Sequence, residues 1–170
     1  MLDSERENEM KAGDLLDVFF LSNPFHRGMV EKLILVGTGI CGRVFSWTEF
    51  SISPFSNILG AVLILLGYAF HWWIEKGHHQ AHEESHDIDK IVTTGVYAKI
   101  RHPLYLSLIV MNLGIALAFG VLVSFVVALL TIVHWGLTSW REEEALLRSF
   151  PDEYGRYKQD IRWRMIPGVF

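Results

Sequence analysis

Two short motifs of opposite charge stand at the two ends of one long apolar segment. The first is Arg101-His102-Pro103, and the second is Glu142-Glu143, which follows directly on Arg141. The residues between the motifs, 103–140, contain no Asp, Glu, Lys or Arg. A bilayer core about 30 Å thick needs about 20 helical residues, so this segment is long enough for two crossings. Because a helical hairpin returns to the side on which it starts, the sequence predicts that the two charged motifs are neighbours.

The first motif is typical of a small anion-binding site. Proline is tolerated at the first position of a helix, because the N–H group that it lacks has no partner there. His102 is then the capping residue. Arg101, His102 and the free N–H groups of the first turn form a positive pocket for a carboxylate or a phosphate. The alternative is a basic membrane anchor followed by an ordinary helix start.

The second motif is typical of a cation-binding site. Consecutive acids, Glu142 to Glu144, at the C-terminal end of a helix oppose the helix dipole, so contacts with a cation would favour them there. A polar stripe leads to them along the same helix, formed by Ser124, Thr131, His134, Thr138 and Arg141. Polar residues at membrane depth usually face the interior of a bundle. The alternative is a charged helix that continues into solvent, with its hydroxyls bonded to their own backbone.

Together the two pockets fit a zwitterionic amino-acid group, with its carboxylate at the first motif and its ammonium at the second. S-adenosylmethionine carries this group and also a sulfonium, which aromatic faces attract. We expect Tyr97 and Tyr105 to lie between the two pockets, where their rings could provide such faces.

Composition predicts an all-α, polytopic integral membrane protein. Of the 170 residues, 51% are hydrophobic and only 20% are charged. The net charge of −4 provides no positive field for phosphates, which argues against a nucleic-acid-binding protein. The single cysteine, Cys41, excludes an intrachain disulfide and a Cys-based zinc site. The alternative is a soluble protein with an unusually apolar helical core.

We expect about four transmembrane helices in a single membrane domain. A second charge-free run, residues 54–73, predicts another span, and a weaker span covers residues 32–47 despite Arg43. Ten of the fifteen Lys and Arg residues lie in residues 76–102 and 141–170, which the positive-inside rule places in the cytoplasm. The expected divisions are an N-terminal interfacial segment (1–28), two spans (29–73), a cytoplasmic loop (74–102), the hairpin (103–140) and a cytoplasmic C-terminal segment (141–170). The membrane is then a prokaryotic cytoplasmic membrane or the endoplasmic reticulum, with the active site on the cytoplasmic side.

Two further motifs give weaker signals. The segment Gly37-Thr38-Gly39-Ile40-Cys41-Gly42 matches the GxGxxG pattern of dinucleotide-binding proteins, but no acid lies about 20 residues further on. Close packing of membrane helices through small residues explains the pattern better. A histidine cluster, formed by His78, His79, His82 and His86, would need a helix to build a metal site. Gly77 weakens such a helix, so we expect a solvated loop and no metal, or alternatively part of a substrate entrance.

The motifs of the C-terminal half resemble those of a known family. The residues that carry the resemblance are Thr94-Gly95-Val96-Tyr97, Arg101-His102-Pro103-Leu104-Tyr105, Glu142-Glu143, Phe150, Asp152-Glu153-Tyr154, Tyr157 and Arg164-Met165-Ile166-Pro167. They look like the membrane methyltransferases typified by isoprenylcysteine carboxyl methyltransferase and the phospholipid N-methyltransferases. The resemblance covers roughly residues 87–167, just under half of the chain.

This resemblance implies an S-adenosylmethionine-dependent enzyme whose cofactor lies between the RHPxY segment and the C-terminal helix, with S-adenosylhomocysteine as the product. By position, the cofactor-binding residues are Asp89, Lys90, Ile91, Val92, Tyr97, His102, Pro103, Leu104, Tyr105, Glu142 and Glu143. We expect Arg101, Arg141 and Glu142 to be catalytic. Isoprenylcysteine enzymes carry an acceptor-binding arginine four residues before the first glutamate, where this chain has Thr138. Arg141 is a candidate substitute for that arginine.

The expected reaction is in-line transfer of a methyl group to an oxygen, sulfur or nitrogen of a lipophilic acceptor. The acceptor would be an isoprenylcysteine-like carboxylate, or a lipid amine or thiol, and the other partners are membrane lipids. Such a transfer depends mainly on positioning and on exclusion of water. An amine would also lose a proton, to His102 or to a glutamate. The alternatives are an NADPH-dependent membrane reductase related to sterol reductases, and a non-catalytic metal or haem protein.

Overall fold

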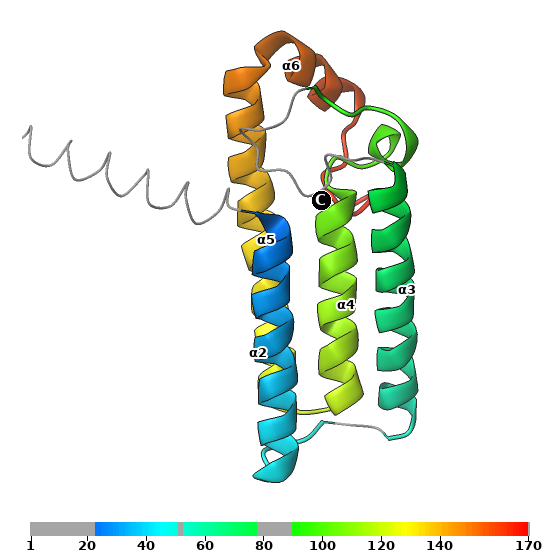
Figure 1. The fold of residues 1–170 in the computed structure, drawn as a ribbon, viewed down its shortest axis with the longest axis vertical. Helices are drawn as coiled ribbons and strands as arrows, with labels where there is room; N and C mark the ends of the chain where they lie inside the picture. The colour runs from blue at the N-terminus through cyan, green and yellow to red at the C-terminus, as the bar shows by residue number, and fades with distance from the viewer. Residues whose placement is uncertain (1–22, 51–52, 78–89, 170) are drawn as a thin grey trace, which may run out of the picture.

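The computed structural model describes residues 23–50, 53–77 and 90–169, and four long helices lie side by side in it (Figure 1). They are α2 (Pro24–Val44), α3 (Phe55–Gly77), α4 (Pro103–Phe119) and α5 (Leu122–Ser149). The 3-10 helix η1 (Gly95–Ala98) precedes α4, and α6 (Pro151–Asp160) follows α5 at one end of the bundle. The described residues contain helices and no strand, which confirms the expected all-α class.

The helices α4 and α5 form the predicted hairpin. Pro103 occupies the first turn of α4, and His102 is its N-cap residue. The helix ends at Phe119 because Gly120 adopts a left-handed conformation (φ 66°), which glycine tolerates and other residues rarely adopt. Since α5 has 28 residues and α4 has 17, α5 reaches back to the level of His102 and carries its acidic residues there.

Glycines allow the helices to approach one another closely. A Cβ atom at Gly60 of α3 would overlap the backbone of Ala118 in α4, and one at Gly39 of α2 would overlap the ring of Phe119. The GxGxxG segment therefore lies inside a helix and packs against the hairpin, as the helix-packing explanation predicts. A dinucleotide site would need a strand before this segment.

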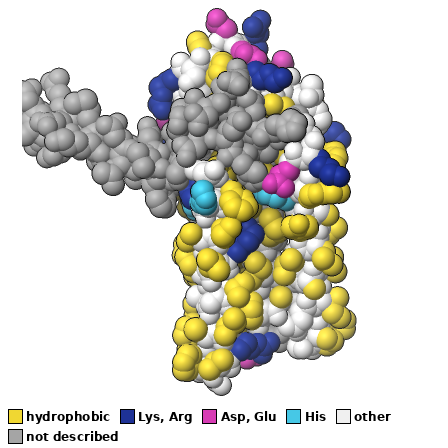
Figure 2. Space-filling model, in the orientation of Figure 1, with side chains coloured by type: hydrophobic (Ala, Val, Ile, Leu, Met, Phe, Trp, Pro, Cys, Tyr) yellow, Lys and Arg dark blue, Asp and Glu magenta, His cyan; other side chains and the backbone are white. Residues whose placement is uncertain are grey.

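The outer surface of the bundle is apolar. Helices α3 and α5 are long and apolar enough to cross a membrane, and only 17% of the apolar window of α3 is buried. A core helix of a soluble protein would instead be covered by its neighbours. Figure 2 shows apolar side chains over the long helices, while most charged side chains gather toward the end that carries α6. These features are those of an integral membrane protein.

Candidate functional site

The C-terminal part of the chain holds the Arg101-His102 segment in place. The backbone N–H of Arg101 donates to the carbonyl of Trp163 (3.0 Å), and the N–H of His102 donates to the carbonyl of Arg164 (2.8 Å). The guanidinium of Arg101 also donates through Nη1 to the carbonyl of Ile161 (2.6 Å). The start of α4 is therefore attached to the segment that follows α6.

Glu143 is the centre of a buried ion-pair network. Its Oε1 accepts hydrogen bonds from Nε of Arg101 and from Nε of Arg164, both at 2.9 Å, and its Oε2 pairs with Nζ of Lys158 at 3.1 Å. Nε2 of His102 lies 3.3 Å from Oε1. A carboxylate that is 1% exposed is costly to desolvate unless it is well paired, and here four cationic side chains surround it. Glu143 thus connects α5 with α6, with the start of α4 and with the C-terminal segment.

Glu142 faces the same histidine from its other ring nitrogen. Nδ1 of His102 lies 3.3 Å from Oε2 of Glu142, and the hydroxyl of Tyr105 donates to that oxygen (2.6 Å). Both ring nitrogens of an imidazole donate only when it is protonated. Burial alone would lower the pKa of His102, but the hydrogen bonds and charges of Glu142 and Glu143 outweigh it and raise the pKa above its ordinary value. The site therefore favours the imidazolium form of His102.

Tyr97 in η1 lies beside this cluster. Burial raises the pKa of Tyr97, and the negative charge of Glu142 raises that pKa further. The backbone carbonyl of Tyr97 accepts a hydrogen bond from the hydroxyl of Tyr157 (2.8 Å), which attaches η1 to α6. Tyr97 is therefore a neutral phenol held at a fixed place next to the glutamates.

A continuous stack of four rings leads from this cluster into the bundle. His102 stacks on Tyr105 with the ring centroids 5.4 Å apart, Tyr105 stacks on Trp135 at 4.7 Å, and Trp135 stacks on His134 at 5.0 Å. These separations lie in the favourable range for aromatic pairs. Because Trp135 is fully buried, the stack fixes α4 against α5 and ends at a second polar cluster.

The second cluster is centred on Glu31 of α2. Its Oε1 accepts a hydrogen bond from Nδ1 of His134 (2.7 Å), and its Oε2 accepts from Nε1 of Trp135 (2.8 Å) and from Nδ2 of Asn112 (2.9 Å). One helical turn earlier, Arg27 donates through Nη1 to Oγ1 of Thr138 (2.9 Å). Charged groups within a membrane bundle usually mark functional positions.

Arg27 and Glu31 were not predicted as site residues, although the sequence carries a signal for them. The two residues stand four positions apart and carry opposite charges, so they share one face of a helix. The polar stripe of α5 was expected to face the interior of the bundle. This is confirmed for Ser124, Thr131 and Thr138, which are all buried.

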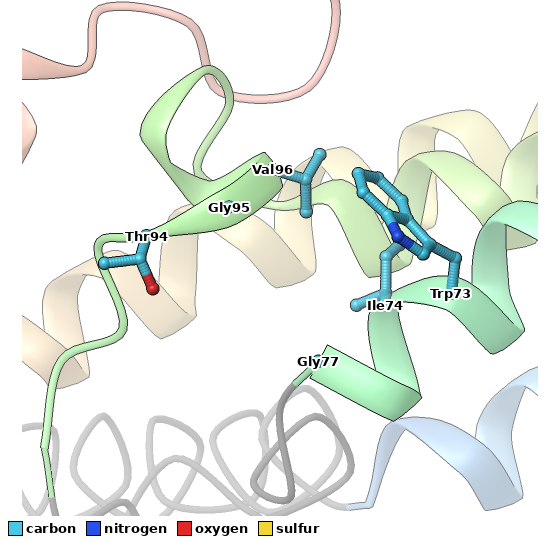
Figure 3. A pocket seen from close by; sticks show the side chains of 6 residues that line it. All are labelled: Trp73, Ile74, Gly77, Thr94, Gly95 and Val96. Carbon is cyan, nitrogen blue, oxygen red and sulfur yellow. The ribbon is translucent and has the colours of Figure 1, made fainter.

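A cavity of about 270 Å³ lies between the end of α3 and η1. Trp73, Ile74 and Gly77 line it from α3, and Thr94, Gly95 and Val96 line it from the other side (Figure 3). In Figure 3 the indole of Trp73 lies close to the side chain of Val96. The volume is near the lower end of the range for small-molecule sites, which is about 300–1,000 Å³, and the lining suits a flat apolar group.

The structure brings five of the predicted site residues into direct contact: Arg101, His102, Tyr105, Glu142 and Glu143. Pro103 and Leu104 are buried in the first turn of α4. Upstream, Lys90 is exposed and Val92 is half-buried, while Ile91 packs against the cluster of Leu146, Tyr154 and Tyr157. Arg141 lies beside Glu144 (3.9 Å) and the ring of Trp140 (5.7 Å).

Several predicted residues lie outside the described part of the chain. These are Asp89 and the histidines His78, His79, His82 and His86, together with most of the N-terminal interfacial segment. Within residues 23–50, 53–77 and 90–169, no group of three or more His, Cys, Asp or Glu side chains is placed to hold a metal ion. The role of the histidine-rich loop stays a prediction.

Comparison with known proteins places these motifs in a family. The model of the phospholipid methyltransferase family matches residues 55–153, which is more than half of the chain and includes both charged motifs. A protein-S-isoprenylcysteine O-methyltransferase of Schizosaccharomyces pombe is 35% identical over 74 residues, which cover 42% of this chain and 30% of that protein. A protein of the same name from Dictyostelium discoideum is 28% identical over 99 residues, covering 54% of this chain and 38% of the relative. The matches thus span about a third of the length of these relatives. The chain belongs to the phospholipid methyltransferase family.

Proposed function

We propose that this protein is an S-adenosylmethionine-dependent methyltransferase that methylates a lipophilic acceptor. The family supports methyl transfer, and the names of the two relatives describe an isoprenylcysteine acceptor for those proteins. The observation that carries the proposal is the contact of His102 and Tyr105 with Glu142, because it joins the two motifs at one end of the bundle.

The side chains at this end fit S-adenosylmethionine in charge and in shape. Four cations, Arg101, His102, Lys158 and Arg164, surround Glu143, and His102 also contacts Glu142, so positive charge remains for the carboxylate of an amino-acid group. Glu142 provides a carboxylate for the ammonium. The cavity beside Trp73 suits the flat adenine ring.

When bound, S-adenosylmethionine supplies an electrophilic methyl group, which passes to an oxygen, sulfur or nitrogen of the acceptor while the electron pair of the C–S bond stays on sulfur. Tyr97 offers an aromatic face to a sulfonium, whereas the ring of Tyr105 is buried and stacks on His102 and Trp135. Arg101 and Glu143 act as positioning residues, since they hold α5 against the segments around it. An amine acceptor must also lose a proton, for which His102 and the glutamates at this end of the bundle are the candidates.

We further propose that all four long helices span the membrane, with the α6 end in the cytoplasm. The 17 residues of α4 extend about 26 Å, which is at the short end of the range for a span. In a Cys41→Ser background, a cysteine introduced at Ser53 should react with an impermeant label from outside intact cells, and one at Asp160 should not. The reverse pattern would exclude a cytoplasmic site.

The proposed cofactor site is tested by S-adenosylhomocysteine binding. Hydrogen bonds to charged groups contribute about 1.5–3 kcal/mol, so Glu142→Gln should weaken binding roughly tenfold to a hundredfold in calorimetry of the detergent-solubilised protein. Arg148→Ala, further along α5, is the matched control and should bind normally. If Glu142→Gln binds like the wild type, Glu142 does not hold the cofactor. If NADPH binds to the wild type instead, the reductase alternative is favoured.

A further inference from the structure

We propose that Arg27 of α2 binds an oxyanion of the methyl acceptor and thereby selects lipophilic acceptors that carry a carboxylate or a phosphate. The inference rests on the proposed function, because it assumes that an acceptor approaches the Glu142 end of α5. It concerns a helix that lies outside residues 55–153, so the family match assigns no role to this arginine.

The guanidinium of Arg27 has an unused donor. Its contacts with Oγ1 of Thr138 (2.9 Å) and Nε2 of His134 (3.4 Å) both use Nη1. Nε is buried and has no hydrogen-bond partner in the described part of the chain. A buried donor without a partner costs about 1–3 kcal/mol, so a bound acceptor atom at this position would remove that cost.

Arg27 also differs from other arginines in its charge pairing. Arg101 and Arg164 pair with Glu143, and Arg43 pairs with Glu49, whereas Arg27 makes no ion pair with a carboxylate in the described ranges. The two carboxylates near Arg27 are already occupied by other donors. Glu31 accepts three hydrogen bonds, and Glu142 contacts both His102 and Tyr105.

The planar fork of a guanidinium matches the two oxygens of a carboxylate or a phosphate. Thr138 and the ring of Trp135, whose centroid lies 5.0 Å from the guanidinium carbon, hold this fork in place. A free oxyanion would find here a cation that is half-buried, positioned and incompletely paired. Such a site favours anionic ligands over neutral ones of the same shape.

The position of Arg27 joins the cofactor site to the lipid-facing surface. Its guanidinium also hydrogen-bonds to the side chain of Tyr105 and interacts electrostatically with Glu142, and both of these residues are part of the proposed cofactor site. Its neighbours Met29 and Val30 are large apolar residues exposed on the outside of α2. An acceptor whose hydrocarbon chain lies in the membrane can therefore place its oxyanion on Arg27, next to the proposed cofactor site. In a carboxylate acceptor, one oxygen of this group is also the nucleophile.

Two probes distinguish the sources of the oxyanion. The first is S-farnesyl-N-acetylcysteine, a carboxylate, compared with its neutral methyl amide. The second is a short-chain phosphatidylethanolamine, which carries a phosphodiester. Binding of each probe is measured by calorimetry in detergent, with S-adenosylhomocysteine affinity and thermal stability measured on the same samples.

We expect the wild type to bind at least one of the two oxyanion probes, the carboxylate or the zwitterionic phosphodiester, at least tenfold more tightly than the neutral amide. Arg27→Gln should weaken that binding roughly tenfold to a hundredfold, while leaving binding of the neutral amide unchanged and changing S-adenosylhomocysteine affinity by less than about tenfold. Lys32→Gln is the matched control, because Lys32 is another half-buried cation of α2 and its Nζ donates to the carbonyl of Gly28 (3.2 Å). This variant should bind every probe normally. Arg27→Lys keeps the positive charge without the planar guanidinium and should show an intermediate loss of affinity for the oxyanion probe. This variant also provides the test if Arg27→Gln does not fold.

The inference is wrong if Arg27→Gln and Arg27→Lys bind the oxyanion probes like the wild type, or lose the oxyanion and neutral probes equally. It is also wrong if the wild type does not prefer an oxyanion probe. These results leave the proposed function standing as long as the wild type binds S-adenosylhomocysteine. If the wild type fails to bind S-adenosylhomocysteine, the proposed function fails, whatever Arg27 does.

Discussion

Replacing Glu143 by glutamine tests how strongly the ion-pair network holds the functional end of the bundle together. Glutamine keeps the shape of the side chain, but it removes the negative charge from the centre of four cations. Breaking a buried ion pair by removing one partner costs about 3–5 kcal/mol. In a protein of this size 1 kcal/mol shifts Tm by about 2–4 °C, so Glu143→Gln should lower Tm by roughly 6–20 °C.

The assay is thermal unfolding in detergent, followed by circular dichroism, with Glu144→Gln as the control. Glu144 is the next residue in α5, its side chain is 39% exposed, and its pairing with Arg141 is loose at 3.9 Å. Exposed pairs contribute about 0–1 kcal/mol, so this control should change Tm by no more than about 4 °C. Equal Tm values for Glu143→Gln and Glu144→Gln would refute the reasoning that Glu143 holds these segments together.

Three further predictions concern protonation, packing and the histidine-rich loop. Because folding raises the pKa of His102, the contribution of this histidine to stability is complete below the ordinary pKa of about 6.5 and is lost as the pH rises through the raised pKa. Tm should therefore fall over that pH range, and His102→Gln should flatten the dependence of Tm on pH. Gly60→Ala should lower Tm because its Cβ would overlap the backbone of Ala118, whereas Gly37→Ala, with open space around it, should not. The joint replacement of His78, His82 and His86 by alanine should change S-adenosylhomocysteine affinity by less than tenfold, which corresponds to about 1.4 kcal/mol. A larger loss of affinity in calorimetry would show that the loop takes part in cofactor binding.

The local features of the hairpin could be predicted from the sequence because they depend on short-range rules. Proline at position 103 fixes the start of a helix, and Gly120 provides the left-handed turn that ends it. The charge-free length between the two motifs then determines that His102 and Glu142 are neighbours. Their 3.3 Å contact follows from this geometry.

The pairing within the cluster could not be predicted, because it depends on which neighbours compete for each charge. The sequence led us to expect Arg101 in a pocket open to a ligand. In the structure its guanidinium donates to Glu143 and to the carbonyl of Ile161, a residue sixty positions away. The sequence contains no periodic signal for such a contact, since the segment after α6 is not helical.

The cluster around Glu31 was missed for a related reason. Its partners lie on two other helices, and Asn112 and His134 are separated from Glu31 by 81 and 103 positions. Taken by itself, the sequence of α2 is only weakly apolar and contains charged residues, so it resembles an interrupted membrane span. Only the packing of α2 against α4 and α5 shows that Glu31 faces polar side chains of these two helices inside the bundle.

A methyl-transfer assay on the purified protein is the direct test of the proposed function. The purified protein is placed in lipid vesicles with S-adenosylmethionine labelled on its methyl group and with S-farnesyl-N-acetylcysteine or phosphatidylethanolamine as acceptor, and label in the organic phase is counted. We expect that label passes to at least one acceptor, that Glu142→Gln abolishes most of this transfer and that Arg148→Ala retains it. Transfer by Glu142→Gln at the wild-type rate would contradict the proposed site, and the absence of transfer to either acceptor by a protein that binds S-adenosylhomocysteine would contradict the proposed acceptor class.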